Sequence, residues 1–136
     1  MKKKVFLFLL ATIEITVSRA EYDAARANWG GAWRMPTDAE CQELIDNCTW
    51  TYVEDYNGSG VNGYEAKGTN GNSIFFPVTN YYNGNTLYNE GNYSYYWSSS
   101  IHTTLSPSAW YMKFTSDSEN MVVAIRSSGC TVRPVR

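Results

Sequence analysis

The sequence predicts an α+β domain in which two short helices pack on small antiparallel sheets joined by long loops. Three observations support this fold class. Aromatic residues make up 15% of the 136 residues while charged residues make up only 18%, which is typical of a β-containing fold rich in tyrosine and tryptophan. Short aromatic or β-branched runs are separated by Ser, Asn, Gly and Pro. Two helical patterns stand near the start, and the length suits one domain with a modest core.

The second helical pattern is the clearer of the two. Thr37 is a good N-cap, and Glu40 three residues later completes a capping box. One apolar stripe with the spacing of a helix follows, which predicts a helix packed on a sheet; it consists of Cys41, Leu44, Ile45 and Cys48.

The first helix is expected over residues 22–28, which are rich in alanine. Gly30 and Gly31 end it. Trp29 and Trp33 stand on either side of this stop, and we expect both to be buried anchors. Together with Trp97 and Trp110 they are expected to build the scaffold.

The middle of the chain reads as strands and loops. Residues 49–53 and 63–67 have strand character, and Asn70-Gly71 is a tight-turn signal before a strand over residues 73–77. This last strand is expected to bury Ile74 with a phenylalanine. Residues 80–92, rich in Asn, Gly and Tyr, are expected to form a long surface loop.

The last third predicts a small sheet from residues 95–100, 109–114 and 121–126. Alternation places Trp110, Met112 and Phe114 toward the core and leaves Tyr111 and Lys113 on an open face. Residues 122–125 form a continuous apolar run, which fits either a central strand or exposed residues that serve a partner.

The first 20 residues have the pattern of a signal peptide. Lys2, Lys3 and Lys4 precede an apolar stretch over residues 5–13, and small residues at Ser18 and Ala20 suit a signal peptidase. The stretch is too short for a membrane span. The sequence therefore predicts an exported chain whose mature domain covers residues 21–136, with no membrane span; a first β-strand here is the alternative.

The net charge of the chain bears on its possible partners, and its cysteines bear on its possible disulfide bonds. A formal net charge of −2 gives no basic patch for phosphate backbones, so no nucleic-acid partner is expected. The three cysteines, Cys41, Cys48 and Cys130, cannot all pair within the chain. They are interpreted as small apolar side chains, with a Cys48–Cys130 bridge as the alternative.

Residues for catalysis are sparse. The single histidine, His102, stands in a Ser/Thr-rich stretch with no acid or nucleophile placed beside it by a motif. Asp117, Glu119 and Asn120 supply oxygens close together, but acidic turns are also common on surfaces. The sequence predicts no enzymatic activity, no cofactor and no metal site.

Five motifs occur in the order of one known family: residues 23–31 (DAARANWGG), 33–37 (WRMPT), 70–75 (NGNSIF), 96–100 (YWSSS) and 131–136 (TVRPVR). In these the chain resembles the Fibrobacter succinogenes major paralogous domain, found in surface and secreted proteins of gut bacteria. The resemblance covers about residues 22–136 and implies a C-type lectin-like fold, similar to the variable proteins of diversity-generating retroelements. It says far more about fold than about ligand.

The resemblance also implies a ligand-binding set, because the variable proteins contact their ligands through chosen C-terminal positions. In this chain these positions are Ile101, His102, Thr103, Tyr111, Lys113, Asn120, Val122, Val123, Ile125, Ser127, Ser128 and Cys130. An undiversified relative with the same fold is the alternative.

The sequence thus predicts a secreted or cell-surface module that binds a protein or carbohydrate ligand through the C-terminal sheet face. A passive structural or adhesive subunit is the second hypothesis, and its face would be covered by the chain itself or a neighbouring copy. The third is an oxidoreductase similar to the formylglycine-generating enzyme. That activity needs a close cysteine pair, whereas Cys130 stands alone in its region.

Overall fold

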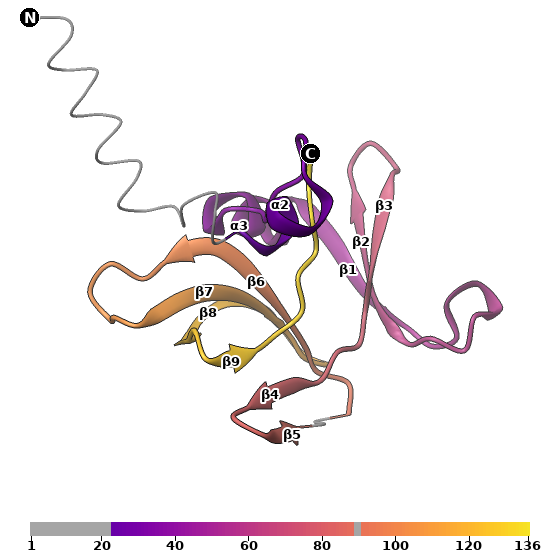
Figure 1. Ribbon diagram of the computed structural model, residues 1–136. Helices are drawn as coiled ribbons and strands as arrows, with labels where there is room; N and C mark the ends of the chain where they lie inside the picture. The colour runs from indigo at the N-terminus through magenta and orange to yellow at the C-terminus, as the bar shows by residue number, and fades with distance from the viewer. Residues whose placement is uncertain (1–22, 89–90) are drawn as a thin grey trace, which may run out of the picture.

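A computed structural model describes residues 23–88 and 91–136 (Figure 1). These residues form two short helices and nine strands in small antiparallel sheets, so the described chain is mostly β. The first sheet has the order β1-β2-β3, with β1 Cys48–Val53, β2 Gly63–Gly68 and β3 Ser73–Pro77. The second has the order β6-β7-β8, with β6 Ser94–Ile101, β7 Ser108–Phe114 and β8 Glu119–Ile125. The third joins β5 Thr86–Tyr88, β4 Tyr81–Asn83 and β9 Ser128–Gly129. A 3-10 turn, η2 Tyr56–Gly58, follows β1.

The short first helix, α2 Ala24–Trp29, forms as expected, but the tryptophan at its end is not buried as expected. Asp23 caps it by accepting a hydrogen bond from the Arg26 N–H at 2.9 Å. Trp29 is 57% exposed, so the prediction of a buried anchor is wrong. It is the last residue of the helix, where Gly30 takes a φ of 64° and turns the chain away.

The second helix, α3 Asp38–Asn47, has the predicted capping box between Thr37 and Glu40. Cys41 is 1% exposed, and Leu44 and Ile45 pack against the core. The helix ends one residue before the end of the predicted stripe. Cys48 is extended (φ −112°, ψ 151°), so it begins β1 while still packing against the core.

The core lies between α3 and the two larger sheets. Phe114 is fully buried at its centre, with ring centroids 4.7 Å from Trp50 and 5.4 Å from Phe76. Tyr64 and Tyr96 complete this aromatic cluster. Aromatic residues dominate because large rings supply most of the apolar area that such a small core can bury.

The expected strand over residues 73–77 forms, but only one of the two side chains expected to be buried, the phenylalanine, is buried. Phe76 is 2% exposed, whereas Ile74 is 40% exposed. Both side chains point to the same face, and Ile74 lies opposite Ala66, nearer the turn of the β2–β3 hairpin. Phe75 points to the other face and stacks on Tyr56, with the ring centroids 3.9 Å apart.

Residues 81–88 form a β-hairpin where a long loop was predicted. β4 pairs with β5 from Tyr81↔Tyr88 to Asn83↔Thr86, and Gly84 takes the positive φ of 59° that so short a turn requires. The Tyr81 and Tyr88 rings stack 5.0 Å apart. β4 also pairs with β9, which fixes the hairpin to the C-terminal part of the chain.

The β6-β7-β8 sheet is the predicted C-terminal sheet. Met112 and Phe114 face the core as expected, being 2% and 0% exposed, while Trp110 is half-buried. Among the described residues, β8 pairs only with β7, so it is an edge strand rather than a central one. In Figure 1, α3 lies above this sheet, and β9, β4 and β5 lie below it.

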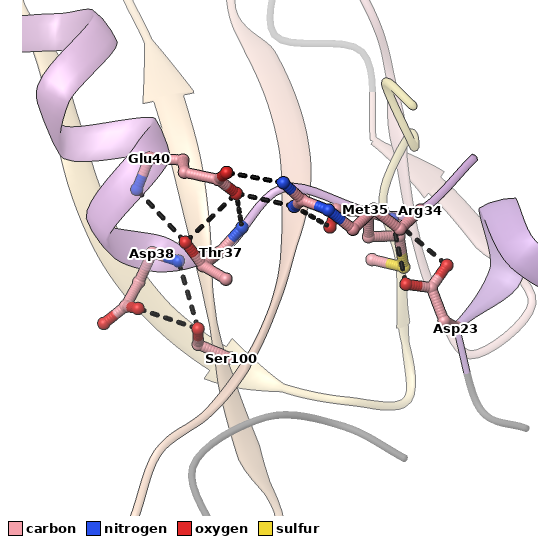
Figure 2. A network of polar contacts seen from close by, with 7 residues as sticks. All are labelled: Asp23, Arg34, Met35, Thr37, Asp38, Glu40 and Ser100. Atoms are coloured by element: carbon pink, nitrogen blue, oxygen red, sulfur yellow. Dashed lines mark hydrogen bonds and ion pairs between the residues drawn. The ribbon is translucent and has the colours of Figure 1, made fainter. Parts of the chain in front are cut away.

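A polar network around residues 34–37 ties distant parts of the chain together (Figure 2). The Asp23 carboxylate accepts the Met35 N–H at 2.9 Å and 3.1 Å, and Arg34 forms a bidentate ion pair with Glu40 at 2.7 Å and 2.6 Å. The Arg34 backbone exchanges two hydrogen bonds with Val135 near the C-terminus. We call residues 34–37 the strap.

The ion pair in this network makes a pH-dependent contribution to stability. Hydrogen bonds from Arg34 lower the pKa of Glu40 from its ordinary value of 4.5 to about 2. A carboxyl whose pKa is lower in the folded state stabilises the fold above its unfolded pKa, and that contribution is lost as the pH falls from about 4.5 toward about 2.

We therefore predict that Glu40→Gln lowers the free energy of unfolding by about 1 kcal/mol at pH 7, a small value because both side chains are partly exposed. The difference from the wild type should vanish near pH 2. Urea denaturation across this pH range measures it, with Glu43→Gln on the exposed face of α3 as the matched control. A constant difference at all pH values would contradict the assignment.

Candidate ligand-binding face

One face of the β6-β7-β8 sheet carries the residues that could contact a ligand. Cross-strand register places Trp97, Tyr111 and Val122 side by side, and Tyr95, Lys113 and Asn120 in the next row. Because side chains alternate along a strand, these six point away from the core that Met112 and Phe114 enter. The face therefore offers aromatic, cationic and apolar groups together.

The small third sheet covers part of this face. Tyr81 of β4 packs on Tyr95 of β6 with the ring centroids 4.7 Å apart. Between the two sheets remains a pocket of about 260 Å³. We call it the tyrosine pocket, and it is lined by Tyr81, Asn83, Tyr95, Tyr111, Lys113, Ala124, Ser128 and Cys130.

Lys113 supplies the positive charge of the tyrosine pocket. Its Nζ lies 5.0 Å from the centroid of the Tyr93 ring and 5.9 Å from that of the Tyr95 ring. Such cation–π contacts hold an ammonium group in place without neutralising it. The pocket thus presents a positioned cation beside phenol rings, an amide and a hydroxyl.

Tyr111 is less accessible than predicted. It lies on the expected face, but its side chain is 8% exposed because Trp97 and Tyr95 pack around it, with ring centroids 5.7 Å and 6.0 Å away. The expectation of an open position for Tyr111 is therefore wrong. Lys113 is half-buried and reaches the pocket, as its neighbouring rings allow.

The structure divides the twelve candidate residues into groups. Four line the tyrosine pocket: Tyr111, Lys113, Ser128 and Cys130. Asn120 and Val122 extend the same sheet face, whereas Val123 and Ile125 point to the opposite face and Ser127 is exposed in the turn after β8. The remaining three, Ile101, His102 and Thr103, line a different pocket.

This second pocket, of about 400 Å³, lies beside the start of α3. It is lined by Thr37, Asp38, Ala39, Ser100, Ile101, His102, Thr103 and Trp110. The His102 ring lies 5.2 Å from the Trp110 ring, and its Nδ1 accepts the Leu105 N–H at 3.0 Å. Ser100 donates its hydroxyl hydrogen bond to Asp38 at 2.7 Å, so these side chains organise the loop and the helix start.

Sequence reasoning missed half of the tyrosine pocket. Tyr81 and Asn83 were assigned to a surface loop, and Tyr95 was counted only as part of a strand. The available signal was Asn83-Gly84, a frequent hairpin turn pair, with tyrosines on both sides. Nothing in the sequence indicates that this hairpin folds under the C-terminal sheet, because that contact joins segments far apart in the chain.

The three cysteines are free thiols in the structure. Burial raises the pKa of the Cys41 thiol to about 12 and that of Cys130 to about 11. Thiolates are the reactive form, so both side chains are poor nucleophiles at neutral pH. The possible Cys48–Cys130 bridge is not formed.

Residues 23–88 and 91–136 contain no group of three or more His, Cys, Asp or Glu side chains that could hold a metal ion. In the same part of the chain, no helix is long and apolar enough to cross a membrane.

Fold and site together define a small, mostly β domain with a pocket on one sheet face. The chain belongs to the Lcl C-terminal domain family, whose model matches residues 11–136. This is the Fibrobacter major paralogous domain family, so the family indicated by the sequence motifs is confirmed. Comparisons with curated proteins and with solved structures give no match.

Cys130 offers a reporter of the tyrosine pocket. Raising its pKa from 9.0 to about 11 lowers its thiolate fraction at pH 8. We predict that iodoacetamide alkylates folded Cys130 roughly 100-fold more slowly than the same thiol in denaturant, because burial raises the pKa of the thiol to about 11 and leaves less reactive thiolate. The rate should climb as the pH approaches 11. Mass mapping identifies the site, and equal rates in the folded and unfolded states would contradict the assigned burial.

Proposed function

We propose that this domain is a non-enzymatic ligand-binding module of an exported bacterial protein, and that its ligand enters the tyrosine pocket. The observation that carries the proposal is the pocket itself. Three phenol rings, a positioned ammonium group, an amide and a hydroxyl converge on one cavity of about 260 Å³. Tyrosine suits binding because a rigid ring buries much area at little entropic cost.

The polar lining favours a carbohydrate over an apolar ligand. Sugars combine hydroxyl groups with flat C–H faces, which hydrogen-bond donors and aromatic rings accommodate together. The volume lies below the usual range of about 300–1,000 Å³ for drug-sized ligands. It therefore suits one sugar ring, or a single side chain of a protein ligand.

The apolar run over residues 122–125 is compatible with this ligand. Of its four residues only Val122 and Ala124 point to the ligand side, and Ala124 lines the pocket. Val123 and Ile125 point to the other face. Only half of the run therefore meets a ligand.

The passive-subunit alternative keeps one supporting observation. It required the sheet face to be covered by the chain itself, and β4, β5 and β9 do cover part of it. The pocket that remains between the layers is what favours binding. The oxidoreductase alternative is disfavoured because Cys41 and Cys130 are weakly acidic free thiols.

The proposal also includes the fold type and the diversification of the C-terminal positions. A C-type lectin-like fold is supported by the resemblance of the five sequence motifs. Diversification of the C-terminal positions rests on resemblance, and an imperfect repeat of the coding segment beside a reverse transcriptase would test it.

Export is supported by the lysines and the apolar stretch at the start of the chain, which lie outside the described residues. Family membership is compatible with a surface role. N-terminal sequencing of the protein recovered outside the cytoplasm tests export. A new N-terminus at Glu21 is expected, and retention of the full chain in the cytoplasm would contradict it.

The binding proposal predicts the effect of two substitutions at the edge of the tyrosine pocket. Lys113→Ala removes the cation, and Asn83→Ala removes an exposed amide. Each should weaken binding at least roughly tenfold, as expected when a polar partner in a binding site is lost. Both side chains are at least partly exposed, so the fold should be retained.

The measurement is a glycan array together with a panel of bacterial surface proteins, followed by calorimetry with the best ligand. Lys67→Ala, at an exposed position of β2 that does not line the pocket, is the matched control and should bind like the wild type. Unchanged binding in both pocket variants would place the site elsewhere. Absence of any ligand in the screen would favour the passive subunit.

A further inference from the structure

A third pocket, of about 320 Å³, lies on the other side of β7 from the tyrosine pocket. It is surrounded by α3, the strap, β3, β7 and the C-terminal segment, which runs from β9 toward the helices in Figure 1. Met112 lines it, whereas its neighbours Tyr111 and Lys113 line the tyrosine pocket. Neighbouring side chains along a strand point to opposite faces, so the two pockets are separate sites. We call the third one the arginine pocket.

Apolar side chains form most of the lining of the arginine pocket. They come from α3, β3, β7 and the C-terminal segment, and include Cys41, Leu44, Ile74, Phe76, Met112 and Val135. Cys41, Phe76 and Met112 are at most 2% exposed, so they form a packed base. Ile74 is 40% exposed and leaves apolar surface in contact with water. Covering that surface with the apolar part of a ligand is favourable.

Two arginines that line this pocket have no carboxylate partner in the part of the chain that the structure describes. The guanidinium carbon of Arg133 lies 5.2 Å from the centroid of the Phe76 ring, and one of its N–H groups donates to the Phe75 carbonyl at 3.0 Å. Arg136 lies over the Trp33 ring at 5.0 Å. A ring holds a guanidinium in place but leaves its charge and most of its N–H donors for other acceptors.

The third arginine of the lining is already neutralised. Arg34 forms the bidentate ion pair with Glu40, which also lines the pocket. Three arginine side chains and one glutamate side chain therefore leave two positive charges unbalanced. Because these charges stand beside an apolar base, the lining is complementary to a ligand with an apolar body and a negatively charged end.

We propose that the arginine pocket binds a small carboxylic acid with an apolar chain or ring. The apolar part lies against Leu44, Ile74 and Met112, and the carboxylate is held by the guanidinium groups of Arg133 and Arg136. A guanidinium group suits this role because its planar fork matches the two oxygens of a carboxylate. The volume stands at the lower end of the usual range of about 300–1,000 Å³ for small-ligand pockets, which fits an acid of this kind.

The test is a titration of octanoate into the full, isotope-labelled chain at neutral pH, followed by amide chemical shifts. Octanoate should bind saturably with a dissociation constant of about 1 mM or below, and should shift the amides of Leu44, Ile74 and Arg133. Octanol has the same chain without the charge, so it should bind at least roughly tenfold more weakly. Equal affinities, shifts centred on Lys113, or no saturable binding of octanoate would overturn the proposal.

Charge variants separate the arginine pocket from general attraction by a positive surface. Arg133→Gln and Arg136→Gln should each weaken octanoate binding at least roughly fivefold, because each removes one of the two unbalanced charges. Arg136 is exposed, so this variant should keep the fold even if loss of the Arg133 hydrogen bond affects it. Arg126→Gln is the matched control, since Arg126 also donates to a backbone carbonyl but does not line the pocket. Equal effects of Arg126→Gln and Arg136→Gln would overturn the proposal.

A negative charge placed on the apolar wall gives an independent test. Ile74→Glu should abolish octanoate binding by repelling the carboxylate, and the exposure of Ile74 should allow the fold to be retained. Ile125→Glu, the same change at a residue that is 49% exposed and does not line the pocket, should bind like the wild type. Lys113→Ala should also leave octanoate binding unchanged, which keeps this test distinct from that of the tyrosine pocket. Unchanged binding in Ile74→Glu would contradict the site.

Discussion

The strap over residues 34–37 is the constraint on which the rest of the structure depends. Its backbone meets the N-terminal helix through Asp23 and the C-terminal segment through Val135, and its Arg34 side chain holds the first turn of α3 through Glu40 (Figure 2). Asp23 is 6% exposed, and its carboxylate accepts hydrogen bonds from two backbone N–H groups, those of Arg26 and Met35, so a buried charge is matched by donors. Loss of the strap would remove the contacts of both α2 and the C-terminal segment.

Held by the strap at Val135, the C-terminal segment runs along the edge of β6 and pairs with it at Thr131. The core behind that sheet is aromatic and centred on Phe114, while the opposite face is left for other contacts. β4, β5 and β9 cover part of that face and leave the tyrosine pocket between the layers. The proposed binding site is thus a product of two sheets that are held at a fixed distance by tyrosine packing.

Local signals in the sequence predicted the local structure well. The Thr37 capping box, the Asn70-Gly71 turn and the alternation at Met112 and Phe114 each involve neighbours in the chain, and each is present. The failures concern distant contacts. Trp29 is exposed because the burial of a side chain depends on its neighbours in space and not on its neighbours in sequence. The position of the β4–β5 hairpin is set by the pairing of β4 with β9. The pocket combines Tyr81, Tyr95 and Lys113, which no local pattern connects.

We propose the tyrosine pocket, and not the pocket beside His102, as the ligand site. Amide chemical shifts recorded while the best ligand from the binding screen is titrated into the full chain test it most directly. A ligand in the tyrosine pocket should produce saturable changes at Asn83, Tyr95, Lys113 and Ser128, with little change at His102 and Trp110. Changes centred on His102 and Trp110 would contradict it.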